Sequence, residues 1–387
     1  MGGNAFVNLN VPRMSSRLYY RMIEEFMPKL DVFFERVVVP RDAPSKPDHG
    51  DIDFLVGGIR IPLRGDDLWK RIEGALAADH RVARGGSQSY AIPHPNITNA
   101  HIQVDVELAP GDGTLGANDL FEWTKLMKGD GDLMQIIGIT HRSLGLVCTD
   151  RGLHVRIEEI EPYDKKKALL FLTRDVRQAI EFYKFDVPKY EEGFQNETEI
   201  FNWVAGGRFF SPWVYKQAVE KVADRARRRK RPMYRHFVDE FMPERRETSG
   251  KIWTRQEVLH EALRKFDVQD EYNAKMLTHR NEQAEENLWK DIKALIPLSD
   301  ISQRTAIKAL RRFVAFDSQH EPYLVHHPLA LDNQPRWSNF VTEDTRADLL
   351  EWVKLNWKEA NDRERSAAVL NGHYRGTANL HQGSREA

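Results

Sequence analysis

The chain of 387 residues contains a single cysteine, Cys148, so an intramolecular disulfide is excluded and a cysteine-based zinc site is implausible. Long apolar runs are also missing. No stretch approaches the roughly 20 residues of a membrane-spanning helix, and the N-terminus lacks the apolar core of a signal peptide. We therefore expect an intracellular protein of a reducing compartment, cytoplasmic or nuclear, with no membrane partner.

An excess of positive charge is missing as well. The 57 lysines and arginines are balanced by 58 aspartates and glutamates, for a formal net charge of −1. A nucleic-acid partner would therefore have to meet a local basic patch. With 41% hydrophobic and 30% charged residues, the composition is typical of a soluble globular protein, and its length suffices for two or three domains.

The spacing of apolar residues predicts an α+β fold in the first half of the chain. Residues 15–35 have helical spacing, with Ser15 or Ser16 as N-cap and Pro28 as the point where the helix should kink or split. Further helices are predicted at 67–78, 116–127, 132–144 and 174–184, strands at 37–39, 51–56 and 101–109, and hairpins at 82–92 and 147–156.

Helical spacing dominates from 196 to about 358, and the remainder is polar. The expected organisation is a first domain over 1–190, a helical domain over 195–360 and a flexible tail over 361–387.

Three aspartates are the strongest candidates for chemistry. Asp51 and Asp53 are two residues apart in a strand pattern, so they project from one face, while Ile52 faces the core. Asp105 lies in the alternating segment 101–109, and Glu107 on the same face is an alternative ligand. If the two strands pair, the carboxylates gather at one point, and carboxylate oxygens are the ligands that Mg²⁺ or Mn²⁺ prefers.

A family resemblance builds on these aspartates. The run from His49 to Val56, HGDIDFLV, resembles the GDxD strand of the family X polymerases, members of the DNA polymerase β-type nucleotidyltransferase superfamily. Val104-Asp105 resembles the strand that bears the family's third aspartate, and the segment 129–153 resembles its thumb. The resemblance covers about 35–186. It implies a polymerase β-like nucleotidyltransferase domain, a mixed sheet flanked by helices, followed by a mostly α-helical domain.

The resemblance also implies roles. Asp51, Asp53 and Asp105 would be the catalytic metal ligands, with Asp105 on the metal that lowers the pKa of the attacking hydroxyl. The family's Gly-Ser pair is absent: its place reads Val39-Pro40-Arg41-Asp42. The residues expected to bind the nucleotide instead, around the loop 41–50 and at the start of the thumb-like segment, are Arg41, Lys46, His49, Gly50, Gly129 and Asp130.

A basic stretch, RARRRKR at 225–231, is the candidate nucleic-acid surface. Its cations are Arg225, Arg227, Arg228, Arg229, Lys230 and Arg231, and Tyr234 nearby could stack on a base. A nuclear-localisation signal and a solvated helix face paired with Asp239, Glu240 and Glu244 are equally open.

The expected function is transfer of a nucleoside monophosphate from an NTP or dNTP to a hydroxyl, with Mg²⁺ or Mn²⁺, the acceptor being a DNA or RNA 3′ end. Two alternatives stay open. One is nucleotidyl transfer to a small molecule or a protein, and the other is a catalytically inactive relative that binds nucleic acid.

Overall fold

The computed structural model describes residues 3–60, 65–213, 222–245, 251–332 and 334–382. Backbone contacts divide the chain into two compact units, Met1–Tyr272 and Asn273–Ala387, and each is described by itself. None of the helices in the described ranges combines the length and the apolarity that crossing a bilayer requires.

A five-stranded mixed sheet is the centre of the first unit. Its strands are β2 (Phe34–Val38), β4 (Ile52–Ile59), β5 (His80–Arg84), β6 (Ser87–Pro93) and β7 (His101–Leu108), in the order β2-β4-β7-β6-β5. The pair β4–β7 is parallel and the other neighbours are antiparallel. The prediction of an α+β fold with a mixed, helix-flanked sheet is confirmed.

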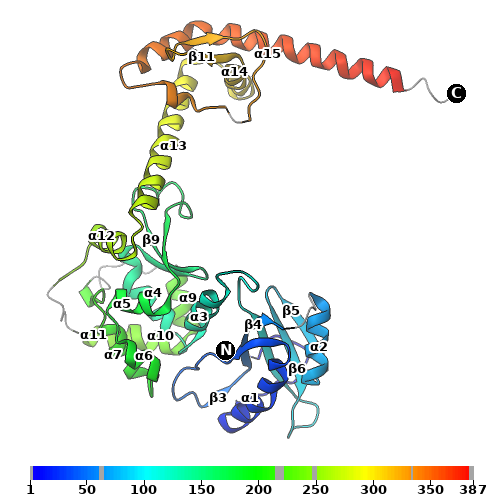
Figure 1. The fold of residues 1–387 in the computed structure, drawn as a ribbon, viewed down its shortest axis with the longest axis vertical. Coiled ribbons are helices and arrows are strands. Elements are labelled where there is room, and N and C mark those ends of the chain that lie inside the picture. The colour runs from blue at the N-terminus through cyan, green and yellow to red at the C-terminus, as the bar shows by residue number, and fades with distance from the viewer. Residues whose placement is uncertain (1–2, 61–64, 214–221, 246–250, 333, 383–387) are drawn as a thin grey trace. The chain divides into compact units, whose positions relative to one another are not determined.

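Helices α1 (Ser16–Asp31) and α2 (Asp66–Leu76) cover one face of this sheet (Figure 1). The Ser15 hydroxyl oxygen accepts a hydrogen bond from the Leu18 N–H and caps α1, as predicted. The prediction that Pro28 could split the helix is wrong, because α1 is a single element through that residue. Phe26 and Leu30, on either side of the proline, are buried in the core, and this packing outweighs the loss of one backbone donor.

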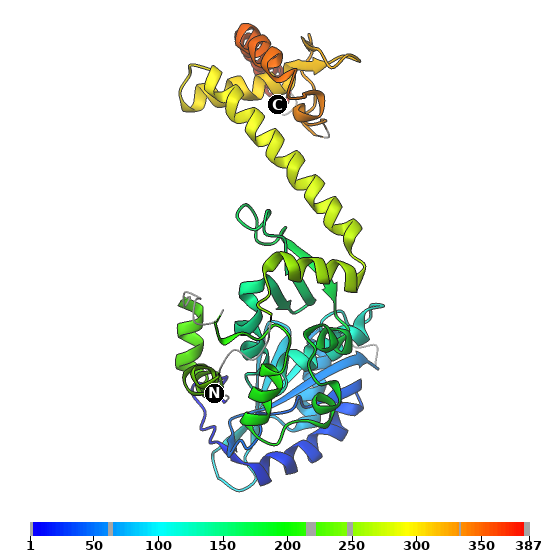
Figure 2. The same ribbon diagram turned by 90° about the vertical axis from the view of Figure 1, so that its left-hand side faces the viewer.

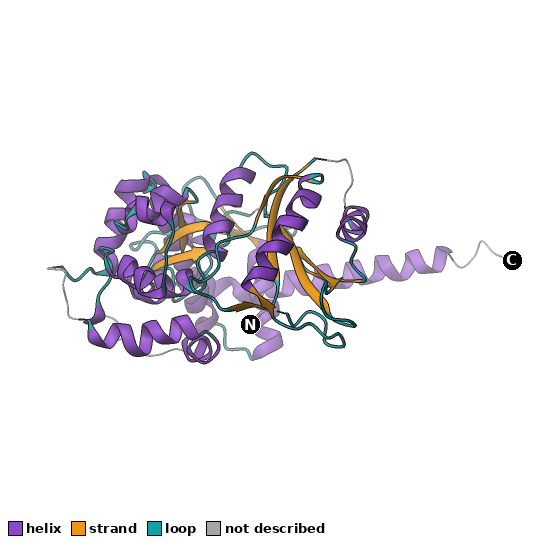
Figure 3. Ribbon diagram, turned by 90° about the horizontal axis from the view of Figure 1, so that it is seen from below, coloured by secondary structure: helices purple, strands orange, loops and turns teal. Residues whose placement is uncertain are grey.

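Most of the rest of the first unit follows β7 in the chain. A second, antiparallel sheet has the order β10-β9-β8 and is separate from the first in Figure 3. Its strands are β8 (Leu146–Thr149), β9 (Gly152–Arg156) and β10 (Leu169–Thr173). A two-stranded pair joins β1 (Met14–Ser15) to β3 (Asp48–His49). The helices are α3 (Ala117–Lys128), α4 (Leu133–His141), η1 (Arg142–Leu144), α5 (Val176–Tyr183), α6 (Val187–Glu192), α7 (Glu197–Ala205), α9 (Val222–Lys230), α10 (Pro232–His236), η2 (Phe237–Phe241), α11 (Met242–Glu244) and α12 (Arg255–Phe266).

The second unit is mainly helical. It contains most of the long helix α13 (Gln269–Leu295, yellow in Figure 2), with α14 (Asp300–Phe313), the hairpin β11 (Val314–Phe316) and β12 (Pro322–Leu324), η3 (Trp337–Phe340) and α15 (Arg346–Gln382). Its core includes Trp289, Leu310, Phe313, Trp337 and Val353.

The predicted tail does not begin at residue 361. Helix α15 continues to Gln382, and Asn361 and Glu364 are only 5% exposed. Glu364 accepts hydrogen bonds from Arg312 at 2.7 and 2.6 Å. The polar composition suggested a solvated segment, but Glu364 is buried in an ion pair with Arg312.

Candidate metal centre

Three carboxylates meet beside the parallel pair β4–β7. One oxygen atom from each of Asp51, Asp53 and Asp105 lies within 4.8 Å of the other two. Asp53 and Asp105 stand side by side in the strand register, and Asp51 immediately precedes β4. The structure thus brings together the three residues that the sequence singled out. We call them the carboxylate cluster.

Strand alternation explains why the cluster lies on one face. Ile52 and Phe54 flank Asp53 and are buried against α1 and α2, as are the valines on either side of Asp105. Because successive side chains of a strand point to opposite faces, both aspartates must lie on the face that α1 and α2 leave uncovered.

Hydrogen bonds fix the orientation of two of the carboxylates. The buried amide of Gln103 donates to both oxygens of Asp105, at 3.1 and 3.0 Å, and accepts from the Ala5 N–H at 2.9 Å. Asp51 accepts from the Gly3 N–H at 3.1 Å. Sequence reasoning missed these neighbours, although Gln103 shares the strand face of Asp105 and could have been found by alternation.

The segment 3–11, which we call the N-terminal arm, runs past the cluster. Ala5 and Phe6 pack against Ala91 of β6, with Leu9 and Val11 alongside. Gly3 has φ +84°, and a Cβ there would lie 2.7 Å from the Gly50 carbonyl oxygen. Glycine is therefore required for the arm to approach the strand this closely.

The cluster is electrostatically strained without a cation. Desolvation, followed by the negative charges of Asp51 and Asp105, raises the pKa of Asp53 to about 7, although its side chain keeps a solvent-exposed surface. Desolvation also raises the pKa of Asp105, and the polar groups of Ser89 and Gln103 partly offset it. Two effects thus raise the pKa of Asp53, burial and repulsion by the neighbouring carboxylates. A bound cation would relieve the repulsion.

Two cations near the cluster were not anticipated. Lys128 Nζ lies 2.7 Å from Glu107 Oε2, and its positive charge acts against the raised pKa of Asp53. Arg84, at the end of β5, acts in the same direction on the pKa of Asp105. Glu107, considered above as an alternative ligand, is instead paired with Lys128. Nothing in the spacing of the sequence links α3 to this site, so Lys128 could not be found before the fold was known.

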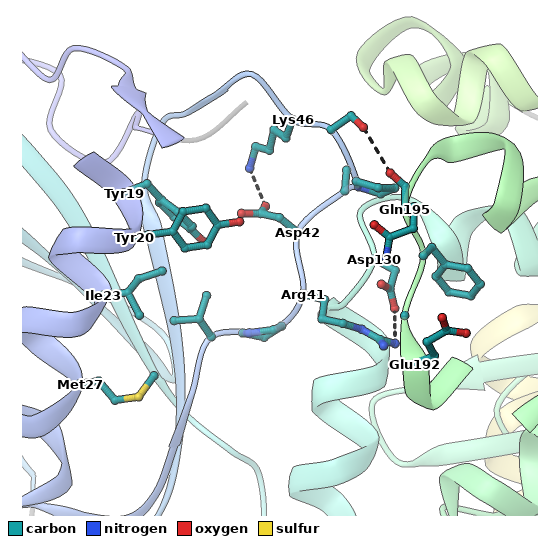
Figure 4. A pocket seen from close by; sticks show the side chains of 17 residues that line it. Tyr19, Tyr20, Ile23, Met27, Arg41, Asp42, Lys46, Asp130, Glu192 and Gln195 are labelled. Atoms are coloured by element: carbon teal, nitrogen blue, oxygen red, sulfur yellow. Dashed lines mark hydrogen bonds and ion pairs between the residues drawn. The ribbon is translucent and has the colours of Figure 1, made fainter. Parts of the chain in front are cut away.

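Arg41 and Asp130, both predicted to bind the nucleotide, form an ion pair with each other. The Arg41 guanidinium lies 2.9 Å from Asp130 Oδ2 (Figure 4). It also donates to the Tyr190 carbonyl at 2.7 Å, and the Asp130 N–H donates to the Arg41 carbonyl. Asp130 is 3% exposed. The two residues fasten the loop 40–46 to the turn after α3.

Lys46 and His49 are also engaged. Lys46 donates to Asp42 at 2.7 Å (Figure 4), and His49 Nδ1 lies 3.0 Å from the other Asp42 oxygen. His49 stacks on Tyr19 with ring centroids 3.7 Å apart. Burial lowers the pKa of His49, which favours the neutral ring.

The two glycines predicted to bind the nucleotide have structural roles. Gly129 caps α3, and its N–H donates to the Lys125 and Leu126 carbonyls. Gly50 receives the close approach of Gly3. All six predicted nucleotide residues thus have contacts within the unit, and the cations whose charges act on Asp53 and Asp105 are Lys128 and Arg84.

A cavity of about 580 Å³ is formed by α1, the loop 40–46 and residues 192–195. Tyr19, Tyr20, Ile23 and Met27 form its aromatic and apolar wall (Figure 4). Its charged lining has a net charge of −1, from Arg41, Lys46, Asp42, Asp130 and Glu192. Such a lining suits a neutral or cationic group better than a triphosphate. None of the three cluster residues lines this cavity; its link to the cluster is Asp42, whose charge contributes to the raised pKa of Asp53.

The basic stretch is partly neutralised within the unit. Three of its arginines form ion pairs of 2.6–2.9 Å: Arg227 with Asp224, Arg228 with Asp239, and Arg231 with Asp132. Arg225, Arg229 and Lys230 are exposed on α9. Tyr234 is 1% exposed, so its ring cannot stack on a base. Residues 214–221, which precede α9 in the chain, lie outside the described residues.

No protein-family model matches the chain, and no curated protein matches it either.

Proposed function

We propose that the chain is a metal-dependent nucleotidyltransferase, which moves a nucleoside monophosphate from an NTP or dNTP to a hydroxyl. The observation that carries the proposal is the carboxylate cluster on the parallel pair β4–β7. Its donor set, carboxylate oxygens alone, fits Mg²⁺ or Mn²⁺. The resemblance of HGDIDFLV and of Val104-Asp105 to the family X polymerases supports the same reading.

The residues of the cluster would share the work. Asp51, Asp53 and Asp105 would hold divalent cations, which supply charge stabilisation for the in-line displacement and acidify the attacking hydroxyl. Gln103 would keep Asp105 in its binding orientation. Lys128, whose charge acts on Asp53, would contact a phosphate oxygen on leaving Glu107.

The acceptor that we favour is the 3′ hydroxyl of a DNA or RNA strand. The exposed cations of α9, Arg225, Arg229 and Lys230, support it. The ion pairs of Arg227, Arg228 and Arg231 make this surface smaller than the sequence suggests.

The first experiment measures incorporation of labelled NTPs and dNTPs, with and without an oligonucleotide, in Mg²⁺ or Mn²⁺. Replacing Asp53→Asn and Asp105→Asn should each lower the rate by roughly a thousandfold, since several kcal/mol of charge stabilisation are lost. Titration with Mn²⁺ should show the matching loss of metal affinity.

Asp67→Asn is the matched control, because Asp67 is an exposed carboxylate on α2, outside the cluster. It should leave both rate and metal affinity unchanged. Equal incorporation by the cluster variants and the parent would refute the proposal, as would a parent protein that binds no Mn²⁺.

A second candidate is nucleotidyl transfer to a small molecule or a protein side chain. The cavity of about 580 Å³ favours it, because a cavity of that size with Tyr19 and Tyr20 in its wall can hold a small acceptor. An acceptor screen with one labelled NTP separates the two candidates. Poor competition by RNA and DNA would favour the small acceptor.

A further inference from the structure

The second unit has a cavity of about 450 Å³ that the proposed function does not use. Its lining carries four cations and one carboxylate, a net charge of +3: Arg304, Lys308, Arg311, Arg336 and Glu285. In a chain whose overall charge is −1, this is a local concentration of positive charge. Such a concavity attracts anions.

Two of these cations, Arg304 and Arg311, are available to bind an external anion. Lys308 lies 3.0 Å from Glu364, and Arg336 lies 3.7 Å from Glu282. Within the described ranges, neither Arg304 nor Arg311 forms an ion pair. Both side chains belong to exposed residues of α14. An external anion would therefore meet them without breaking a contact of the fold.

The floor of the cavity orients Arg311. Its guanidinium lies over the Trp289 ring, 4.5 Å from the centroid, and Trp289 packs on Trp337 at 4.7 Å. A guanidinium held over an indole by a cation–π contact loses little freedom when it binds an anion, and arginine can also stack on a planar group such as a base.

The carboxylate in the wall does not cancel this charge. Glu285 accepts from Trp289 Nε1 at 2.6 Å and from the Ser338 N–H at 2.8 Å, so both of its oxygens are satisfied within the unit. These bonds hold the floor together and spread the negative charge over two N–H dipoles.

The spacing of the cations indicates a chain of anions rather than a single one. Arg304, Lys308 and Arg311 are on one face of α14, at i, i+4 and i+7. At 1.5 Å per residue, Arg304 and Arg311 are about 10 Å apart along the axis. A row of cations of this length matches successive phosphates of a strand.

We propose that this surface, the α14 cavity, binds the phosphodiester backbone of a single-stranded nucleic acid. Arg304 and Arg311 would each contact a phosphate, and Arg311, which lies over Trp289, would also offer a surface for base stacking. Such binding would not depend on catalysis by the carboxylate cluster, and it would place nucleic-acid contact in a unit that lacks a basic run like the one at 225–231.

The test is fluorescence anisotropy of the full chain with labelled single-stranded RNA and DNA, in EDTA, so that metal-dependent chemistry plays no part. The double variant Arg304→Gln/Arg311→Gln should bind roughly 20-fold more weakly at 0.1 M salt. Its slope of log affinity against log salt should fall by about 1.4, which corresponds to two lost phosphate contacts on a single strand.

Two further variants keep the result interpretable. Arg304→Gln alone removes an exposed side chain outside the core and should weaken binding by roughly fivefold. Lys290→Gln/Lys293→Gln makes the same charge change at exposed residues of α13 outside the cavity, and should change affinity by less than about twofold. Melting curves identify any variant that has lost its fold.

Three outcomes would overturn the inference. One is equal binding by the parent and both Arg304 variants. Another is a loss of binding on replacing Arg229 and Lys230 of α9 but not on replacing the cavity arginines. The third is displacement of the strand by polyglutamate of the same charge as effectively as by unlabelled strand, which would indicate an acidic protein partner. Preference for RNA over DNA or the reverse identifies the sugar, and either supports the proposal.

Discussion

At the scale of single residues, the same type of side chain does different work according to what surrounds it. Asp53 belongs to a set of three carboxylates that repel one another. Asp130 is buried opposite one arginine. The first arrangement is relieved by an added cation, whereas the second already contains its cation, so only the first is a candidate for metal binding.

The pair of Arg41 and Asp130 can be tested by a double-mutant cycle. Arg41→Gln, Asp130→Asn and the double variant are compared by urea unfolding. We expect a coupling of roughly 1–2 kcal/mol in the free energy of unfolding, below the value for a fully buried pair because Arg41 is partly exposed. Additive losses in the double variant would mean that the contact does not stabilise the loop 40–46.

The residues of the cluster could be predicted because the two-residue period of a strand is local. Asp51, Asp53 and Asp105 follow from alternation alone, once the two strands pair. The contacts of Arg41 and Lys128 could not be predicted in this way. They join segments far apart in the chain, and a charged residue looks the same in sequence whether it meets a ligand or an internal partner.

At the scale of elements, α4 and α5 meet through a buried polar contact. His141 at the end of α4 hydrogen-bonds through Nδ1 to the Tyr183 hydroxyl at the end of α5. Both side chains are buried and their rings are stacked. Burial, with a smaller contribution from Arg142, lowers the pKa of His141 to about 3.

This contact predicts a pH dependence of stability. Between pH of about 6.5 and 3 the unfolded chain protonates His141 and the folded chain does not, so the free energy of unfolding decreases as pH falls. The loss from this group is about 1.4 kcal/mol per pH unit in that window, or roughly 2 kcal/mol between pH 7.5 and pH 5.

Urea unfolding at several pH values measures it. His141→Gln should show a weaker dependence on pH than the parent, by that amount. His260→Gln, at an exposed position of α12, serves as the control and should follow the parent. Identical pH dependence in His141→Gln and the parent would exclude His141 as the origin.

The sequence predicted which segments form helices better than it predicted where those helices continue or end. Helical spacing identified α1, but the local rule for Pro28 suggested an interruption that packing overrides. Polar composition likewise suggested a tail where α15 continues. In both cases a tertiary contact, Phe26 in the core or Glu364 beneath Arg312, determines the outcome, and composition does not encode it.

At the scale of the whole molecule, two compact units with their own cores share one helix. We expect calorimetry to resolve two unfolding transitions rather than one. Glu364→Gln should lower the free energy of unfolding of the second unit by about 2 kcal/mol, because it weakens the buried pairing of Glu364 with Arg312 and Lys308. The midpoint temperature of the second unit's transition should fall, and that of the first unit should not change.

Asp119→Asn is the corresponding control, since it changes an exposed carboxylate in the first unit. A single transition in the parent, or an equal shift of both transitions in Glu364→Gln, would show that the units unfold as one.

The N-terminal arm has a practical consequence for anyone producing this protein. Gly3 donates to Asp51, so a purification tag or fusion partner placed ahead of it would join the chain within a few residues of the carboxylate cluster. A histidine tag at that end would also bring metal-binding imidazoles to the place where metal affinity is to be measured. Tags and fluorophores are better attached after residue 382, or removed before any titration.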